Sequence, residues 1–159
     1  MGSPMKEHLE SGVWRLEAGE ALPSWVTRLD RTAFGTPWKD PADHEALWLI
    51  PEVAFARWAC IPAAGEAELL RIAVDPAHRG RGLGRTLLEA CQRDLAGEGL
   101  TQLYLEVRVS NQAAIQLYRA CGWEPCGRRS GYWEPCGRRP GYYADGEDAA
   151  LYQWRPASR

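Results

Sequence analysis

Apolar residues gather in short runs along the first half of the chain, and turn residues separate these runs. Four stretches have the length and composition of β-strands: residues 13–17, 46–50, 53–61 and 69–74. A turn at residues 62–65 joins the last two. Asp75 and Pro76 end the fourth, because proline has no N–H group to give to a ladder. We expect the strands from residue 46 onwards to be antiparallel neighbours.

Other stretches repeat apolar residues with the 3.6-residue period of an amphipathic helix. They are residues 22–33, a stretch from Leu83 to Gly97, and a stretch that Ser110 or Asn111 caps and Gly122 ends. In the first of them, Pro23 suits the first turn of a helix. The apolar stripes are Trp25, Val26 and Leu29; Leu83, Leu87, Leu88, Cys91 and Leu95; and Ala114, Leu117, Tyr118 and Cys121.

Residues 102–107 predict a strand between the second and third helices. Leu103, Leu105 and Val107 share one face of it by alternation. Tyr104 and Glu106 share the other face. With a closing strand at residues 148–154, strands and helices alternate in this half of the chain. The sequence therefore predicts an α/β (α+β) fold with a mixed, mostly antiparallel, twisted sheet and helices on both faces.

The tail contains a tandem ten-residue duplication. Residues 123–132 read WEPCGRRSGY and residues 133–142 read WEPCGRRPGY, so only Ser130 and Pro140 differ. Two copies of this length are too few for a solenoid, which needs about three supersecondary units. We interpret the segment as a local duplication in a surface hairpin.

Composition adds limits to this picture. The 159 residues are enough to bury a proper core, and we expect one domain over residues 1–159, with residues 1–4 a cloning remnant before Met5. The net charge of −2 gives no general attraction for nucleic acid. No apolar run approaches the roughly 20 residues of a membrane span, and no signal peptide opens the chain. We expect a cytoplasmic protein without a membrane partner.

Five cysteines occur at irregular positions and form no C-x-x-C pair: Cys60, Cys91, Cys121, Cys126 and Cys136. The histidines have no ligand spacing either. This pattern favours buried or idle thiols over a zinc site or a disulfide framework, and we expect no metal.

A glycine-rich turn follows the strand at residues 69–74. It consists of Arg79, Gly80, Arg81, Gly82, Leu83 and Gly84, and Arg85 follows in the next helix. Glycines let the backbone approach a ligand, and the start of a helix has unpaired N–H groups, so the turn predicts a phosphate site. A P-loop would need Lys-Ser or Lys-Thr after its last glycine, and a dinucleotide fingerprint would need glycine at position 85. Neither is present.

The remaining pattern resembles the pyrophosphate loop [QR]-x-x-G-x-[GA] of the GNAT acetyltransferases. Residues 103–123, LYLEVRVSNQAAIQLYRACGW, resemble the second cofactor segment of that family. They are most similar to RimI-type ribosomal-protein-alanine N-acetyltransferases, with LEVR-x-SN…A-I-x-LY…GF. Weaker similarity in the loop around Phe34 and in the ending extends the match over about residues 34–154.

The resemblance implies acetyl transfer from acetyl-CoA to an amine in a ternary complex. It makes Glu106 the candidate general base and Tyr118 the candidate general acid. A phenol with pKa near 10 and a thiol near 8.5 differ by about 1.5 units, so this proton transfer is only modestly uphill. The alternatives are a solvated strand glutamate and a core tyrosine.

Further roles follow from the same resemblance. The cofactor residues would be Ile72, Ala73, Val74, Arg79, Gly80, Arg81, Gly82, Leu83, Gly84, Arg85 and Asn111. Asn111 could equally be a plain helix cap. Substrate contacts would come from Phe34, Trp38, Arg139, Tyr142 and Tyr143, although the two rings at Phe34 and Trp38 could simply pack on their own loop. Because Tyr142 and Tyr143 follow only the second copy of the duplication, that copy is the favoured one.

The implied acceptor is the N-terminal amine of a protein, and for a RimI-type enzyme the alanine end of the eighteenth small-subunit ribosomal protein. A small-molecule amine such as a polyamine or an antibiotic is the alternative acceptor. A non-catalytic acetyl-CoA-binding module is a further alternative.

Overall fold

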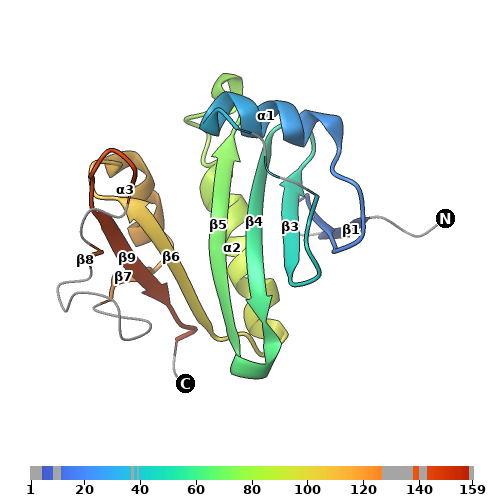
Figure 1. Cartoon of the computed structure of the whole chain (residues 1–159). Helices are drawn as coiled ribbons and strands as arrows, with labels where there is room; N and C mark the ends of the chain where they lie inside the picture. Colours follow the sequence, from blue (N-terminus) through green and yellow to red (C-terminus); the bar gives the residue numbers. More distant parts are fainter. Residues whose placement is uncertain are drawn as a thin grey trace.

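The computed structural model describes residues 5–8, 12–36, 38, 40–126, 138–139 and 143–157 (Figure 1). The strands are β1 Met5–His8, β2 Val13–Leu16, β3 Glu45–Ile50, β4 Ala54–Ile61, β5 Glu66–Val74, β6 Gln102–Arg108, β7 Glu124–Pro125, β8 Arg138–Arg139 and β9 Ala149–Trp154. The α-helices are α1 Ser24–Phe34, α2 Leu83–Gly97 and α3 Gln112–Ala120, with short 3-10 helices η1 Pro62–Ala64 and η2 Pro76–His78.

These strands form one sheet in the order β1-β2-β3-β4-β5-β6-β9-β7, and β8 also pairs with β9. The β5–β6 pair is parallel, and the other described pairs are antiparallel. The predicted antiparallel neighbours β3, β4 and β5 are confirmed. So is the mixed, mostly antiparallel character of the sheet.

Helices cover both faces of the sheet, as predicted. Helix α1 buries Val26 and Leu29 against one face, together with Phe55 and Ala73. Helices α2 and α3 pack on the opposite face (Figure 1) in the larger core cluster, which contains the indoles of Trp48 and Trp58. The amphipathic stripes read from the sequence therefore point into two separate cores.

Four details differ from the sequence-based prediction. Strand β1 was not predicted, because it shows no apolar period and forms by pairing with β2. Strand β5 begins at Glu66, three residues before the predicted start, since Ala67 alone gives no periodic signal there. Pro23 is the N-cap of α1 and lies just before its first turn. The predicted polar face of β6 carries Tyr104, which is buried in a small cluster with Cys126.

Strands β5 and β6 pair only over their first residues. Glu66 to Leu69 pair with Gln102 to Leu105, and no register continues beyond them. Farther on, β5 stays with β4 as far as Val74, and β6 stays with β9 as far as Arg108. Because each strand keeps its outer partner, the two halves of the sheet diverge (Figure 1). This divergence creates an opening at the carboxyl ends of both strands.

Within the described residues, no helix is both long and apolar enough to cross a bilayer. In the same part of the chain, no three His, Cys, Asp or Glu side chains gather in a way that could hold a metal ion. The described cysteines are free thiols, and Cys91, Cys121 and Cys126 are buried. Burial raises the pKa of Cys121 to about 11, and the same effect raises that of Cys60 to about 11, so neither thiol is primed as a nucleophile.

Candidate active site

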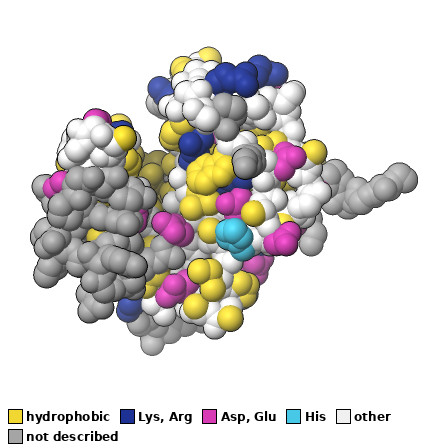
Figure 2. Space-filling model, in the orientation of Figure 1, with side chains coloured by type: hydrophobic (Ala, Val, Ile, Leu, Met, Phe, Trp, Pro, Cys, Tyr) yellow, Lys and Arg dark blue, Asp and Glu magenta, His cyan; other side chains and the backbone are white. Residues whose placement is uncertain are grey.

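A cavity of about 460 Å³ lies at the carboxyl end of β5, beyond the residues that pair with β6. It is lined by Ala33, Phe34, Ile72, Ala73, Val74, His78, Arg79, Gly80, Gly82, Leu83, Gly84, Arg85, Ala113, Ala114 and Leu117. In Figure 2 the surface is hollowed between the lobe that carries α3 and the block beneath α1. The end of β5, the glycine turn and α3 thus form the walls of a single cavity.

The glycine turn brings the start of α2 to the cavity. Gly82 is the N-cap, with φ 74° and ψ 14°, and Gly80 also has a positive φ of 80°. Both residues are in the left-handed region, which favours glycine. No side chain caps α2, so its first N–H groups are available to an anion. The phosphate site predicted from the sequence has the required local geometry.

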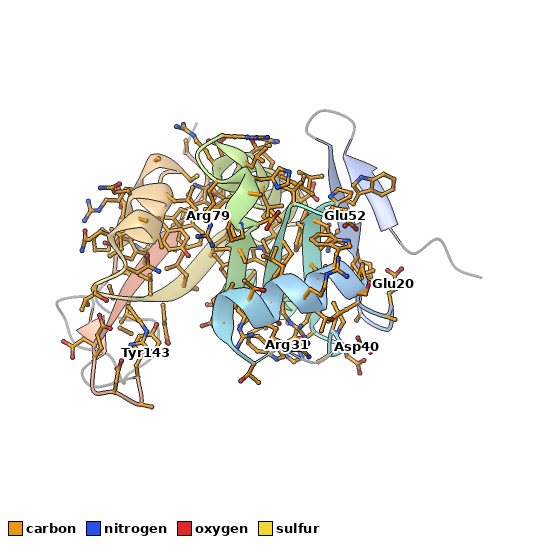
Figure 3. All side chains as sticks on the ribbon, turned by 90° about the horizontal axis from the view of Figure 1, so that it is seen from above. Glu20, Arg31, Asp40, Glu52, Arg79 and Tyr143 are labelled. Atoms are coloured by element: carbon orange, nitrogen blue, oxygen red, sulfur yellow. The ribbon has the colours of Figure 1, made fainter. Side chains whose placement is uncertain are left out.

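Arginines of the turn differ in their positions. Arg79 and Arg85 line the cavity, whereas Arg81 is exposed and does not. The Nε of Arg79 donates to the carbonyl of Val74 at 3.2 Å, and Arg85 forms an ion pair with Glu89. Seen from above, Arg79 lies between α2 and α3 (Figure 3). Two basic side chains, Arg79 and Arg85, therefore line the cavity together with the end of β5.

Helix α3 closes the cavity from the other side. Asn111 caps this helix, since its Oδ1 accepts a hydrogen bond from the N–H of Ala114 at 3.2 Å, and it does not line the cavity. A Cβ added at Gly84 would lie 3.5 Å from Leu117 and 3.6 Å from Val74. Gly84 therefore lies where α2, α3 and β5 meet, and a methyl group there would make ordinary van der Waals contacts with both neighbours.

Some lining residues were not predicted from the sequence. Ala33, His78, Ala113, Ala114 and Leu117 line the cavity without having been assigned to it. His78 is held by Asp75, whose Oδ2 lies 3.0 Å from Nδ1. Ala114 and Leu117 belong to the apolar stripe of α3, and the stripe alone could not distinguish core-facing from cavity-facing positions. The small side chains of Ala113 and Ala114 were the available sign in the sequence that this part of α3 could border a cavity.

The two candidate catalytic side chains come from β6 and α3. Glu106 is half-buried, opposite Leu151 of β9, on the face of β6 that Leu105 does not share. Tyr118 is buried, with its ring centroid 6.1 Å from that of Trp123. Neither residue is among those that line the cavity. Their roles remain predictions.

Tyr143 connects these two groups electrostatically. Burial, and secondarily the neighbouring Tyr143, raise the pKa of Tyr118, so the phenol stays protonated. Burial followed by the Glu106 carboxylate raises the pKa of Tyr143. Seen from above, Tyr143 lies beside β9 (Figure 3). Tyr143 is thus close enough to interact electrostatically with both Glu106 and Tyr118.

The turn that contains Tyr143 is fixed to the end of β6 by Arg108. This guanidinium donates to Asp145 at 2.8 Å and to Glu147 at 2.9 Å, and its Cζ lies 4.1 Å from the Tyr143 ring centroid. Hydrogen bonds from Ser110 and Arg108 lower the pKa of the Glu147 carboxyl. Arg139 pairs through its backbone with Ala149. Tyr142 and residues 127–137 lie outside the described residues.

The loop after α1 presents its two rings differently. Phe34 is 43% exposed and lines the cavity. Trp38 is half-buried, because the guanidinium of Arg57 lies 4.8 Å and that of Arg71 4.6 Å from its ring centroid. The loop does not simply pack its own rings together.

Comparison with known proteins identifies the family to which this fold belongs. Residues 9–123 match the Acetyltransferase (GNAT) family. The [ribosomal protein bS18]-alanine N-acetyltransferase of Escherichia coli K12 is 48% identical over 67 residues, which are 42% of this chain and 45% of that protein. A putative enzyme of the same name from Bacillus subtilis is 31% identical over 143 residues, 81% of this chain and 85% of that protein.

The crystal structure of the ribosomal-protein-S18-alanine N-acetyltransferase from Escherichia coli superposes with a TM-score of 0.67 at 29% identity, covering 88% of this chain and 94% of that one. The high-identity alignment spans less than half of the E. coli protein, at 45%. The family match, by contrast, covers most of this chain, from residue 9 to residue 123. The chain belongs to the GNAT family of acetyltransferases.

Proposed function

We propose that this protein transfers the acetyl group of acetyl-CoA to the N-terminal amine of a protein, and that an alanine-initiated small-subunit ribosomal protein is its acceptor. One observation carries the proposal: the cavity joins the end of β5, beyond its pairing with β6, to the uncapped start of α2. The partial similarity to RimI-type enzymes supports the acceptor.

The cavity has the features that a coenzyme A arm needs. Ile72, Ala73 and Val74 line it where β5 has left β6, and among the described residues no strand pairs with this edge of β5. The edge of a strand offers N–H and C=O groups to an extended amide-containing chain. At the far end, the N–H groups of α2 together with Arg79 and Arg85 suit a pyrophosphate. The residues therefore fit the donor by shape and by charge.

An N-terminal amine suits the candidate base. Its pKa of about 7.7–8.0 leaves roughly one amine in ten neutral at pH 7, whereas a lysine near 10.4 needs far more help. A single half-buried carboxylate such as Glu106 can accept the departing proton, directly or through a water molecule. Tyr118, which burial keeps protonated, can donate a hydrogen bond to the leaving sulfur. Its raised pKa makes full proton transfer harder than the reference values suggest.

A peptide panel tests this proposal. The protein and acetyl-CoA are incubated with an alanine-initiated ribosomal peptide, the same peptide with its N-terminus blocked, and a set of polyamines and aminoglycosides. Mass spectrometry should show one added acetyl group on the free N-terminus only. Turnover of the small amines with inert peptides would refute the acceptor, and binding of acetyl-CoA without any transfer would support the non-catalytic module.

Replacement of Glu106 tests the base. Because a positioned base contributes about a hundredfold or more, Glu106→Gln should lower kcat by about that factor while acetyl-CoA binding persists. Glu124→Gln is the matched control, since this exposed glutamate lies on β7, which pairs with the other edge of the same strand β9. Equal rates for the two variants would contradict the assignment of Glu106 as the base and favour the alternative, a solvated strand glutamate.

A further inference from the structure

Arg71 joins the loop after α1 to the sheet through four contacts. Its Nη1 donates to Asp30 Oδ1 at 2.7 Å and to the carbonyl of Thr36 at 3.0 Å. Its Cζ lies 4.6 Å from the ring centroid of Phe34 and 4.6 Å from that of Trp38. One guanidinium thus contacts the end of α1, the loop backbone and both aromatic rings.

Asp30 completes this attachment. Its side chain is only 3% exposed, and Oδ1 accepts from Arg71 while Oδ2 accepts the backbone N–H of Trp38 at 2.6 Å. One oxygen of this buried carboxylate therefore bonds to β5 through Arg71, and the other bonds to the loop backbone at Trp38. Removal of the guanidinium would leave the Asp30 carboxylate buried with only the Trp38 N–H of these two partners. A buried charge without its counter-charge is costly, so we expect the loop to be released from the sheet.

The position of Arg71 on β5 connects the loop to the donor cavity. Arg71 directly precedes Ile72, Ala73 and Val74, which line the cavity. Strand alternation directs Arg71 and Ala73 towards α1, and Ile72 and Val74 towards the opposite core. Phe34, which Arg71 holds, lines the same cavity and remains 43% exposed. A ring that served only to pack the loop would be covered.

We propose that Arg71 is a positioning residue for the acceptor: it fixes Phe34 and Trp38 as a preformed aromatic wall against which the incoming peptide N-terminus lies. This inference rests on the proposed acetyl transfer and adds a residue that acts on acceptor binding alone. Because the proposed donor contacts come from β5 and from α2, Arg71 itself makes none of them.

Steady-state kinetics with two variants tests the inference. Arg71→Met keeps the aliphatic stem and removes the charge, and should raise the KM for the acceptor peptide about tenfold with kcat and the KM for acetyl-CoA unchanged. Arg71→Lys keeps the charge for Asp30 but loses the planar group, so its KM should lie in between. Arg28→Met is the control. Arg28 is largely exposed, and its substitution removes only an ion pair with Glu52, at 3.9 Å.

Amide hydrogen exchange supplies a readout that does not depend on activity. The N–H of Trp38 should exchange faster in Arg71→Met than in the wild type, since its acceptor Asp30 has lost its partner. An unchanged acceptor KM with faster exchange would refute the positioning role. Parallel changes in both KM values and in Tm would also refute it, in favour of general stability. Wild-type protein that acetylates no peptide would refute the proposed function itself, which is a different outcome.

Discussion

At the scale of single residues, Tyr118 has a structural role in the core, and its role as the general acid stays a prediction. Its ring packs on Trp123 inside the main core, and its pKa is raised because burial disfavours the phenolate. The sequence left two interpretations of Tyr118 open, a core tyrosine and a proton donor. The structure shows the packing of Tyr118 in the core. The same burial raises its pKa, so the phenol is protonated at physiological pH.

The titration of Tyr118 has a consequence for stability. Since its folded-state pKa lies above 10, the unfolded chain loses this proton first as pH rises, so the stabilising contribution is complete below pH 10 and is lost above it. Tyr118→Phe removes this dependence. Urea unfolding at pH 8 and above pH 10 should therefore show a smaller alkaline loss for the variant, by up to about 1.4 kcal/mol per pH unit. Parallel curves would show that Tyr118 is not the titrating group.

At the scale of elements, the start of α2 is the proposed binding site for the donor's pyrophosphate. The helix begins with Gly82 in the left-handed region and without a side-chain cap, an arrangement that leaves its N–H groups for a ligand at some expense of helix stability. The apolar stripe of the same helix is buried, with Leu87, Leu88 and Cys91 in the main core. The stripe fixes the helix so that its open end faces the cavity.

Glycine replacements separate these two functions of α2. Gly82→Ala should weaken acetyl-CoA binding and cost about 1 kcal/mol of stability, because an L-residue is strained at φ 74°. Gly97→Ala, at the other end of the helix, has open space around its Cβ and no positive φ, and should leave binding unchanged. Calorimetric titration with acetyl-CoA measures both. Equal affinities would argue against the glycine turn as the pyrophosphate site.

At the scale of the whole molecule, two half-sheets meet at a short parallel junction. The half from β1 to β5 carries α1 and Arg71, and the half formed by β6, β9, β7 and β8 carries Glu106 and the turn with Tyr143. The cavity proposed for the donor is lined by Phe34 of the candidate acceptor loop, whereas Glu106 and Tyr118 do not line it. Within the duplicated segment, the described residues on either side of 127–137 meet consecutive residues of β9, since the N–H of Cys126 bonds to the carbonyl of Leu151 and Arg138 pairs with Ala150.

Deletion of one copy of the duplication should therefore be tolerated. Removal of residues 127–136 restores a single WEPCGRRPGYY sequence and retains the buried Trp123 and Cys126 and the turn around Tyr143. Thermal unfolding of the variant should remain cooperative, with acetyl-CoA binding unchanged. Only the acceptor KM should respond. Loss of folding would show that both copies are needed by the sheet.

The local elements were largely predictable, because their determinants are local. The period of apolar residues indicated all three helices, and Pro76 and the glycines indicated where strands and helices end. Strand β1 and the start of β5 were not predictable, since their polar residues become strand by pairing with neighbours. Likewise Arg71 carried no signal, because its partners Asp30, Phe34 and Trp38 are far away in sequence.

The sequence by itself determined the glycine turn, the helix stripes and the residue types available for chemistry, since backbone freedom and amphipathicity depend on neighbouring residues. Only the tertiary structure decided which of these residues share a cavity. It placed Ala114 and Leu117 beside the glycine turn, Asn111 at a helix cap, and Arg71 among the rings of a distant loop. The physical reason is the splayed β5–β6 pair, whose divergence depends on the outer partner of each strand and so on contacts between segments far apart in the chain.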